Sequence, residues 1–462
     1  MKVLFCASEV TPFAKTGGLA DVAGSLPLAL GELGVETAIV MPRYRGITEH
    51  DKKLAPNVSV HFIENEPYFN RSGLYGNEGG DYTDNLQRFL FFCGQALALA
   101  AKRGFRADVV HANDWQTALL PVLLKTKFAK DPFFRNTKSL LTLHNLAYQG
   151  HFSHRQYAEV GLDPELFSVD AFEFHGKANV LKAGLVYSDR LNTVSPGYAR
   201  EIKTHEYGCG LEGVLRRRAD DLTGTLNGID TAVWDPAKDT LIQKRFSAQD
   251  LSGKEVCKAT LQKECGLEVN ADVPLFGMVT RLADQKGVGL VCEIAEEFLS
   301  KKVQLVVLGD GDAVHQTAFK TIAARHSKNA YARIGFSGPF AHAVYAGSDF
   351  FLMPSLFEPC GLGQMIALRY GTVPVVRATG GLADTVADIE VDPDGGNGLV
   401  FKEPKAAALS KAIARAMSLF SDDKPCLEAL KRRALKLDFS WNKSAKEYKR
   451  LYEQMMGSEG KS

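Results

Sequence analysis

The 462-residue chain lacks a hydrophobic run long enough to cross a membrane. A membrane-spanning helix needs about 20 consecutive apolar residues, and the longest candidate, residues 89–101, is interrupted by Gly94 and Gln95. The apolar start, residues 3–7, is too short for a secretory leader and is soon followed by Glu9. We therefore expect no membrane partner.

Excess charge and paired cysteines are also missing. Lys and Arg number 55 and Asp and Glu number 54, so the formal charge is +1 and the basic excess typical of nucleic-acid binding is absent. The eight cysteines are scattered and form no CxxC pair, which favours reduced thiols over a disulfide framework. We expect a cytoplasmic protein with no nucleic-acid partner.

Several catalytic motifs are absent as well. The sequence has no GxxxxGK[ST] phosphate loop, no HExxH and no GxSxG. The segment Gly208-Cys-Gly-Leu-Glu-Gly213 matches GxGxxG, but it follows a helical stretch where a dinucleotide-binding motif would follow a strand. The acidic pairs at 310–312 and 392–394 lie in Gly/Pro turns. We therefore expect neither a Rossmann dinucleotide motif nor a metal site.

What the sequence does contain is a regular alternation of short apolar runs and helical stretches. About fourteen such runs predict strands, one of them at residues 88–92, and two sheets of about seven strands are easier to build than one of fourteen. Apolar residues at nearly every position, as in residues 304–308, are typical of parallel strands covered on both faces. The fold class is thus α/β with two doubly wound halves, divided near Asn227, and a final amphipathic helix from Trp441 to Met456.

One hexapeptide occurs twice, as Thr16-Gly-Gly-Leu-Ala-Asp21 and Thr379-Gly-Gly-Leu-Ala-Asp384. Each copy is predicted to join a strand to a helix, where glycine lets a ligand approach and the helix start attracts anions. Lys15 precedes the first copy. The alternative is a tight turn without a ligand. Because the copies follow different strands of their halves, we favour independent use of one device over gene duplication.

Two cations and a carboxylate also follow predicted strands. Arg281 and Lys286 come after residues 274–279, at the edge where open α/β sheets bind ligands, and could pair with a diphosphate. Glu358 lies in a Pro- and Gly-rich loop after residues 349–353 and could hold sugar hydroxyls or balance positive charge. A solvated loop and a structural cap are the respective alternatives. In the first half, His111 and His144 end two strands beside Asp or Asn and favour a polar pocket there.

Together, these segments resemble those of the bacterial glycogen synthase and plant starch synthase family, glycosyltransferase family 5. The matching pieces occur in family order along essentially the whole chain: Lys15-Thr-Gly-Gly-Leu-Ala-Asp21, His111-Ala-Asn-Asp-Trp115, Leu143-His-Asn-Leu-Ala-Tyr-Gln-Gly150, Thr193-Val-Ser-Pro196, Tyr207-Gly-Cys-Gly-Leu-Glu-Gly213, Leu226-Asn-Gly-Ile-Asp230, Arg281–Gly287, Glu358-Pro-Cys-Gly-Leu362, Thr379-Gly-Gly-Leu-Ala-Asp384 and Phe439-Ser-Trp441.

The resemblance implies a GT-B fold, with two Rossmann-like doubly wound domains facing across a deep cleft. It places an acceptor-side domain at residues 1–226 with a returning helix at 438–462, and a nucleotide-sugar domain at 227–437. It implies retaining transfer of glucose from ADP-glucose to the nonreducing end of an α-1,4-glucan, glycogen or a maltooligosaccharide, with release of ADP. Neither a metal nor pyridoxal phosphate is expected as a cofactor.

The resemblance also assigns roles to residues. Arg281 and Lys286 would bind the distal phosphate, and Glu358 would lie by the donor glucose. Around the donor it places Lys15, Gly18, Cys360, Gly361, Thr379, Gly380 and Gly381, with Tyr345 as a candidate for stacking near the adenine. On the acceptor side it places Asp114, His144 and Asn145, with His144 close to the reacting centre, while Asp21 and Asn227 would help to order the closed cleft.

One position departs from the family. Gly363 stands where the family usually has threonine, which removes a hydroxyl from the expected donor pocket. If Gly363 disables the site, the alternative is a catalytically impaired glucan-binding homologue. Two further alternatives are a retaining GT-B glucosyltransferase that uses UDP-glucose and a phosphorylase, which would carry pyridoxal phosphate.

Overall fold

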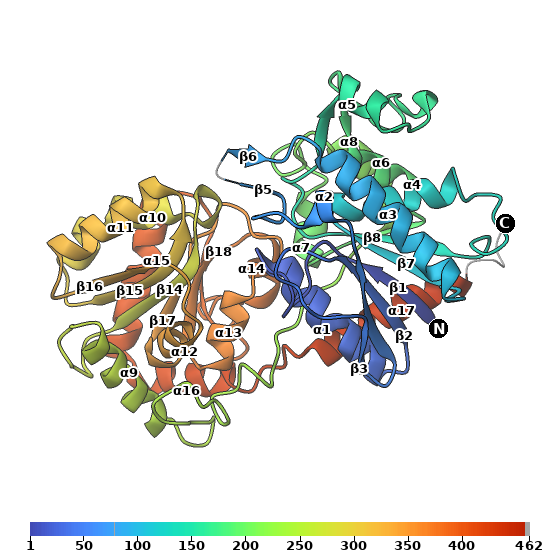
Figure 1. Ribbon diagram of the computed structural model, residues 1–462. Coiled ribbons are helices and arrows are strands. Elements are labelled where there is room, and N and C mark those ends of the chain that lie inside the picture. The colour runs from blue at the N-terminus through green and yellow to red at the C-terminus, as the bar shows by residue number, and fades with distance from the viewer. Residues whose placement is uncertain (78, 458–462) are drawn as a thin grey trace. The chain divides into compact units, whose positions relative to one another are not determined.

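The computed structural model describes residues 1–457 except residue 78. Within this range the chain forms two compact units (Figure 1). Unit 1 comprises Met1–Gly228 and the segment from Trp441 onward, and unit 2 comprises Ile229–Ser440. The division lies two to three residues beyond the boundaries expected from the sequence. The two connecting segments run side by side, because Ile229 pairs with Ser440 in a parallel bridge and its N–H donates to the carbonyl of Phe439 at 2.8 Å.

Unit 1 is built on a sheet of eight strands in the described residues, ordered β13-β12-β8-β7-β1-β2-β4-β3. All neighbours are parallel except β3 and β4. The strands are β1 (Lys2–Cys6), β2 (Glu36–Pro42), β3 (Lys52–Ala55), β4 (Val58–Ile63), β7 (Val109–Asn113), β8 (Lys138–Leu143), β12 (Arg190–Thr193) and β13 (Leu222–Gly224). The apolar residues of the central strands are almost fully buried, as expected for parallel strands that helices cover on both faces.

The helices of unit 1 follow its strands. They are α1 (Gly18–Glu32), α2 (Glu66–Phe69), α3 (Asn85–Lys102), α4 (Leu119–Lys125), α5 (His154–Glu159), α6 (Val180–Tyr187), α7 (Pro196–Glu201), α8 (Glu212–Arg217) and α17 (Trp441–Gly457), with the 3-10 turns η1 (Trp115–Thr117), η2 (Pro164–Leu166) and η3 (Ala219–Asp221). Two small antiparallel sheets are added, β5 (Gly76–Asn77) with β6 (Gly80–Asp81), and β9 (His151–Ser153), β10 (Glu173–Phe174) and β11 (Lys177–Asn179).

The strand expected at residues 88–92 is wrong, since this segment lies inside α3. Its buried residues Phe89, Phe92, Cys93 and Ala96 recur at spacings of three and four, which is the helical period. Arg88 is buried among them, and its guanidinium donates to the carbonyls of Tyr68 at 2.7 Å and Leu74 at 3.0 Å. A short apolar run fits a strand or a buried helix equally well, and here the tertiary packing selects the helix.

The last helix, α17, belongs to unit 1 and packs against α1 (Figure 1, red and blue). Its buried side chains Trp441, Ala445, Tyr448, Tyr452 and Met455 form the stripe expected from the sequence. Two of these residues bond to the sheet. The hydroxyl of Tyr452 lies 2.7 Å from Nδ1 of His111, and that of Tyr448 accepts from Asn192 at 2.9 Å. Because both strand residues are fully buried, these bonds fix the chain end to the sheet.

Unit 2 contains a six-stranded parallel sheet, ordered β16-β15-β14-β17-β18-β19. The strands are β14 (Leu275–Leu282), β15 (Gln304–Gly311), β16 (Ala330–Ile334), β17 (Phe350–Met353), β18 (Val373–Arg377) and β19 (Leu399–Phe401). The helices are α9 (Ser252–Glu264), α10 (Val288–Leu299), α11 (Ala313–Arg325), α12 (Gly338–Gly347), α13 (Gly363–Arg369), α14 (Gly380–Thr385), α15 (Ala406–Asp422) and α16 (Lys424–Ala434), with the 3-10 turn η4 (Asp284–Lys286).

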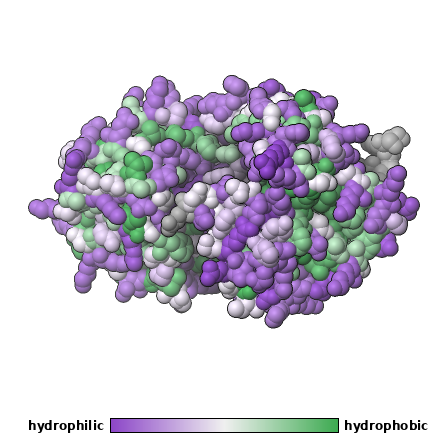
Figure 2. All heavy atoms as spheres, turned by 45° about the horizontal axis from the view of Figure 1, so that its top comes forward, coloured by the Kyte–Doolittle hydropathy of each residue, from purple (hydrophilic) through white to green (hydrophobic). Residues whose placement is uncertain are grey.

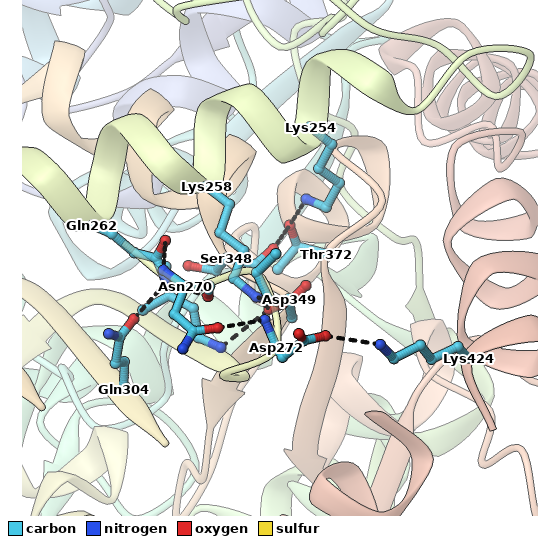
Figure 3. A network of polar contacts seen from close by, with 12 residues as sticks. Lys254, Lys258, Gln262, Asn270, Asp272, Gln304, Ser348, Asp349, Thr372 and Lys424 are labelled. Atoms are coloured by element: carbon cyan, nitrogen blue, oxygen red, sulfur yellow. Dashed lines mark hydrogen bonds and ion pairs between the residues drawn. The ribbon is translucent and has the colours of Figure 1, made fainter. Parts of the chain in front are cut away.

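A buried polar network ties the helices of unit 2 to its sheet (Figure 3). Asp349, just before β17, accepts from Lys258 of α9 at 2.7 Å and from Lys431 of α16 at 2.8 Å. Nearby, the ammonium group of Lys254 donates to Thr372 Oγ1 at 2.6 Å and to the carbonyl of Tyr370 at 2.9 Å. The network joins two helices that are far apart in the sequence to one end of the sheet.

Among the described residues, no helix combines the length and the apolar character of a membrane span. Hydrophilic side chains cover much of the face shown in Figure 2, and the hydrophobic ones are scattered over it in small groups.

Candidate active site

The two cations expected to bind phosphate lie at the carboxyl end of β14 in unit 2. Arg281 is the last residue but one of this strand, which continues three residues further than the sequence indicated, and its guanidinium donates to Gln285 Oε1 at 3.1 Å. Lys286 closes the turn η4, and its ammonium nitrogen lies 2.9 and 2.6 Å from the two carboxylate oxygens of Glu358. The structure therefore brings Lys286 and Glu358 together, although 72 residues separate them in the chain.

The glutamate of this pair is buried, with 4% of its surface exposed. The hydroxyl of Ser355 donates to Glu358 Oε2 at 3.0 Å, and the N–H of Leu356 donates to the carbonyl of Gln285 at 2.8 Å. The loop after β17 is thus bonded to the turn that carries Lys286. A buried carboxylate needs such partners, because desolvation of an unpaired charge is costly.

Sequence reasoning missed a residue that supports this loop, Arg377 at the end of β18. Its guanidinium is buried, and it donates to the carbonyl of Ser355 at 2.9 Å and to that of Leu356. It also donates to the carbonyl of Lys402 at 3.3 Å. The sequence feature that could have identified Arg377 is its place at the end of the apolar strand 373–377. A cation in a buried strand needs hydrogen-bond acceptors close by.

The second copy of the repeated hexapeptide begins α14, but one of its glycines serves packing. A Cβ atom on Gly381 would lie 2.1 Å from the carbonyl oxygen of Cys360, and the Gly381 N–H donates to the carbonyl of Glu358 at 3.0 Å. This N–H is therefore bonded to the Glu358 loop, and the placement of Gly381 around the donor stays a prediction. Gly380 adopts a φ of 42°, in the left-handed region that favours glycine. Thr379 before it is buried.

The loop between Glu358 and α13 is held by one side chain. Gln364 Nε2 donates to the carbonyls of Cys360 at 3.0 Å and Gly361 at 2.9 Å, and Gly361 has a φ of 74°. At Gly363 a Cβ atom would lie 3.2 Å from Met353 Sδ and 3.4 Å from the Tyr345 hydroxyl. These neighbours occupy much of the space that a threonine side chain would need at this position.

Tyr345 does not fit the stacking role that the resemblance implied. On α12 it is 4% exposed, and its ring packs against Phe351 at 4.9 Å and Trp234 at 5.5 Å between centroids. A ring on the inward face of an amphipathic helix cannot stack on a ligand. An aromatic residue that can is Phe336, which follows β16 and is 88% exposed. The signal for it was its place after a strand, since exposed aromatics at that edge are available to ligands.

In unit 1, Asp114 follows β7 in a strained backbone conformation. Its φ is 56° although it is not a glycine, and such strain is common at functional sites. Its carboxylate accepts the backbone N–H of His144 at 2.7 Å. Burial raises the pKa of Asp114 to about 7. Backbone hydrogen bonds from His144 and Asn145 lower this pKa in part, and the negative charge of Glu9 raises it further. This carboxyl therefore titrates near neutral pH.

His144 follows β8 and bonds to the neighbouring strand end. Its Nε2 lies 2.9 Å from Oδ1 of Asn113, whose Nδ2 donates to the carbonyl of Cys6 at 3.0 Å. Because the amide orientation makes Oδ1 the acceptor, His144 carries its proton on Nε2. Burial lowers the pKa of His144 to about 3. The imidazole is thus neutral, and its Nδ1 is a hydrogen-bond acceptor.

His111 does not join this pocket. Its two ring nitrogens lie 2.7 Å from the hydroxyls of Tyr452 and Thr142, inside the sheet and under α17. Of the two histidines expected in the pocket, only His144 lies there. His111 lies inside β7, where its side chain points to one face of the sheet, and only residues at the end of a strand reach the carboxyl edge of the sheet.

The first hexapeptide copy, at the start of α1, differs from the second. A Cβ atom on Gly17 or Gly18 would meet no described residue within 4 Å, so these glycines are not packed against the part of the chain that the structure describes. Lys15 Nζ pairs with the Asp21 carboxylate at 2.6 and 2.8 Å. The glycines of the two copies thus differ, since Gly381 is closely packed in unit 2 and Gly17 and Gly18 are not packed in unit 1.

The remaining expected residues are Asn145 and Asn227. Asn145 Oδ1 accepts the N–H of Ala147 at 3.0 Å, closing the turn after His144. Asn227 is buried, and its Oδ1 has no hydrogen-bond partner in residues 1–77 and 79–457. Within the described residues, no group of three or more His, Cys, Asp and Glu side chains could hold a metal ion.

These features define two Rossmann-like α/β domains, the second of which carries Arg281 and Lys286 at the carboxyl edge of its sheet. The sequence profile of the starch synthase catalytic domain matches residues 2–217, and that of group 1 glycosyl transferases matches residues 265–433. The chain belongs to the family of bacterial glycogen synthases and plant starch synthases.

Individual relatives match over nearly the full length. The chain is 45% identical to a glycogen synthase of Syntrophotalea carbinolica, over 98% of both chains, and 47% identical to one of an Anaeromyxobacter species, over 98% of this chain and 99% of the relative. The catalytic domain of starch synthase IV from Arabidopsis thaliana, bound to ADP and acarbose, superimposes with a TM-score of 0.90 at 34% identity over 99% of both chains. A sucrose-phosphate synthase from Thermosynechococcus elongatus, 18% identical with a TM-score of 0.66 over 99% of both chains, shares the fold.

Proposed function

We propose that the protein transfers glucose from ADP-glucose to the nonreducing end of an α-1,4-glucan, with retention at the anomeric carbon and release of ADP. The observation that carries the proposal is the pairing of Lys286 with buried Glu358 at the carboxyl edge of the unit 2 sheet. Family membership supports it, since the relatives are glycogen synthases and a starch synthase of similar structure binds ADP.

Unit 2 would hold the donor. Breaking the bond between glucose and phosphate leaves a growing negative charge on the diphosphate, and cations at that position stabilise the transition state more than the ground state. Arg281 and Lys286 would supply this charge. The diphosphate would draw Lys286 from Glu358, whose carboxylate would then accept sugar hydroxyls or balance the positive charge that develops on the glucose ring.

The base of the nucleotide needs an apolar surface. Phe336 offers an exposed ring at the same edge of the sheet, two strands from β14, whereas Tyr345 is buried. We propose that Phe336 stacks on the adenine, because aromatic faces bind planar bases without regard to their polar edges.

Unit 1 would hold the acceptor sugar. The neutral His144 can accept a sugar hydroxyl at Nδ1, and Asp114 can do the same when it is ionised. With its low pKa, His144 is a poor base. The proton of the attacking hydroxyl would therefore pass to the leaving phosphate, on the same face of the sugar, which also accounts for retention.

No step in this scheme needs a metal ion or pyridoxal phosphate, because Arg281 and Lys286 supply the positive charge. We place the reaction in the cytoplasm, since none of the eight cysteines, all of which lie in the described residues, forms a disulfide, as is typical of a reducing compartment.

A donor panel tests the proposal. The purified protein is given ADP-glucose or UDP-glucose, each with and without glycogen, and nucleoside diphosphate release and radiolabel transfer to glucan are measured. We expect glycogen-dependent ADP release with matching transfer. A preference for UDP-glucose would assign the other donor, and glucan binding without nucleotide release would indicate an impaired homologue.

A further inference from the structure

The glycine turn of unit 1 is hydrogen-bonded to the buried carboxylate of Glu9, a residue that belongs to none of the motifs found in the sequence. Glu9 follows β1 and is 4% exposed. Its Oε2 accepts the backbone N–H of Thr16 and, at 3.2 Å, that of Gly17, the two residues that precede α1. Its Oε1 accepts the Thr16 hydroxyl at 2.6 Å.

The same carboxylate reaches a second segment. The hydroxyl of Tyr75 donates to Glu9 Oε1 at 2.6 Å and also bonds to the hydroxyl of Ser8 at 2.7 Å. Tyr75 belongs to the glycine-rich segment 72–82, and 66 residues separate it from Glu9. Four donors from two distant segments thus converge on one buried carboxylate.

We propose that Glu9 is a positioning residue. It fixes the turn Lys15–Gly18 in the conformation that contacts the nucleotide sugar. Its bond to Tyr75 also connects this turn to the segment that carries Tyr75. Two observations support this role. Gly17 and Gly18 are not packed against other described residues, so packing does not hold their backbone. Instead, the Glu9 carboxylate accepts the N–H groups of Thr16 and Gly17 and the Thr16 hydroxyl. The proposal rests on the proposed function in one respect, that the turn contacts the donor.

The variants separate bonding from charge. Glu9→Leu removes all four bonds. Tyr75→Phe removes the one bond that Tyr75 donates to Glu9, so the carboxylate that holds the turn loses a partner that orients it. Glu9→Gln can keep all four, because its carbonyl can accept the two N–H groups while its NH2 group donates to the hydroxyls of Thr16 and Tyr75. The matched control is Tyr44→Phe. Tyr44 is a buried tyrosine whose hydroxyl has no hydrogen-bond partner among the described residues. Burial raises its pKa, the charge of Arg88 opposes this rise, and the charge of Glu9 adds to it.

The first measurement is amide hydrogen exchange of the full-length protein, followed in peptides that cover residues 11–18. We expect exchange to quicken about fivefold or more in Tyr75→Phe and Glu9→Leu, and to stay at the wild-type rate in Tyr44→Phe and Glu9→Gln. Wild-type exchange in Tyr75→Phe would overturn the coupling, and this variant decides the matter if Glu9→Leu does not fold. The result does not depend on catalysis, so it stands even if the donor panel rejects ADP-glucose.

The second measurement is the steady-state kinetics of the same proteins. We expect Tyr75→Phe to raise KM for ADP-glucose about fivefold with kcat nearly unchanged, because the turn is less ordered before the donor binds. Glu9→Gln should restore most of the affinity that Glu9→Leu loses. An unchanged KM in Tyr75→Phe, or a Glu9→Gln variant as impaired as Glu9→Leu, would overturn the proposal.

Discussion

The ammonium nitrogen of Lys286 lies within hydrogen-bond distance of both carboxylate oxygens of Glu358, at 2.9 and 2.6 Å, and only 6% of the glutamate side chain is exposed. Each group thus neutralises the other in the absence of substrate. If the proposed function holds, a diphosphate that binds Lys286 would replace this pairing, and Glu358 would become available when the donor arrives.

Lys286→Ala should therefore damage both catalysis and stability. We expect kcat to fall by about 10²- to 10³-fold, as for loss of a group that stabilises the leaving charge. The free energy of unfolding should fall by about 3 kcal/mol, because Glu358 stays buried without its counter-ion. Steady-state assays and urea denaturation measure the two effects.

A second substitution separates these effects. Adding Glu358→Gln to Lys286→Ala removes the stranded charge, so stability should recover while kcat does not. Lys301→Ala is the control, since Lys301 pairs with Glu297 on the surface at 2.9 Å and should change neither quantity measurably. Near-normal turnover in Lys286→Ala would contradict the phosphate role.

Asp114 should give the activity a pH dependence near neutrality. Burial raises its pKa to about 7, so kcat/KM for a maltooligosaccharide should rise between about pH 6 and pH 8 as the carboxyl ionises. Asp114→Asn should remove this rise and lower kcat, with ADP affinity unchanged. The pH profile of kcat/KM and ADP titrations measure these two effects. If Asp114→Asn keeps the rise between pH 6 and pH 8, another group is responsible for that rise.

The same raised pKa affects stability with a definite sign. A carboxyl in an unfolded chain has a pKa of about 3.9, so between about pH 4 and pH 7 the folded protein holds the proton more tightly. Asp114 thus makes the protein less stable as the pH rises through this window. Asp114→Asn should flatten that part of the curve of unfolding free energy against pH.

Asp349 anchors unit 2 from the inside. Burial alone would raise its pKa, but Lys431 and Lys258 lower it well below the ordinary value. Its contribution to stability is present above about pH 4 and is lost as the pH falls below the pKa of the unfolded carboxyl. Asp349→Asn should cost about 3 kcal/mol at neutral pH, since two ammonium groups lose their partner.

The control for this prediction lies in the same network (Figure 3). Asp272 pairs with Lys424 at 2.9 Å, but both side chains are mostly exposed. Asp272→Asn should leave the midpoint of urea unfolding almost unchanged. Equal effects of the two substitutions would show that burial of the Asp349 cluster does not matter.

Phe336 should contribute to donor binding. Phe336→Ala removes an exposed ring and should raise KM for ADP-glucose about tenfold, with little effect on stability because the ring is 88% exposed. Val391→Ala, at a side chain that is 86% exposed, is the control. An unchanged KM would remove the stacking role.

Chelation should leave the reaction intact. If Arg281 and Lys286 supply the positive charge, dialysis against EDTA should not change the rate, and Mg²⁺ should not restore any loss. A rate that falls on chelation and returns with one metal would contradict the metal-free scheme.

The sequence by itself determined the class of fold and the placement of several candidate site residues at the ends of strands. Runs such as residues 304–308 are apolar at nearly every position, which is typical of parallel strands covered on both faces. Arg281, Lys286 and Glu358 follow strands, and parallel strands bring their carboxyl ends to one edge. The apolar stripe of α17 could also be predicted from the sequence, because residues spaced at the helical period lie on one face of a helix.

Only the tertiary structure decided what each side chain of the site does. The two TGGLAD segments are identical in sequence, yet Cys360 packs against Gly381, whereas Gly17 and Gly18 are not packed against other described residues. His111 and His144 both end strand motifs, but one bonds to Tyr452, 341 residues away, and the other lies at the edge of the sheet. Burial and partners come from distant segments, and no local pattern encodes which segments will meet.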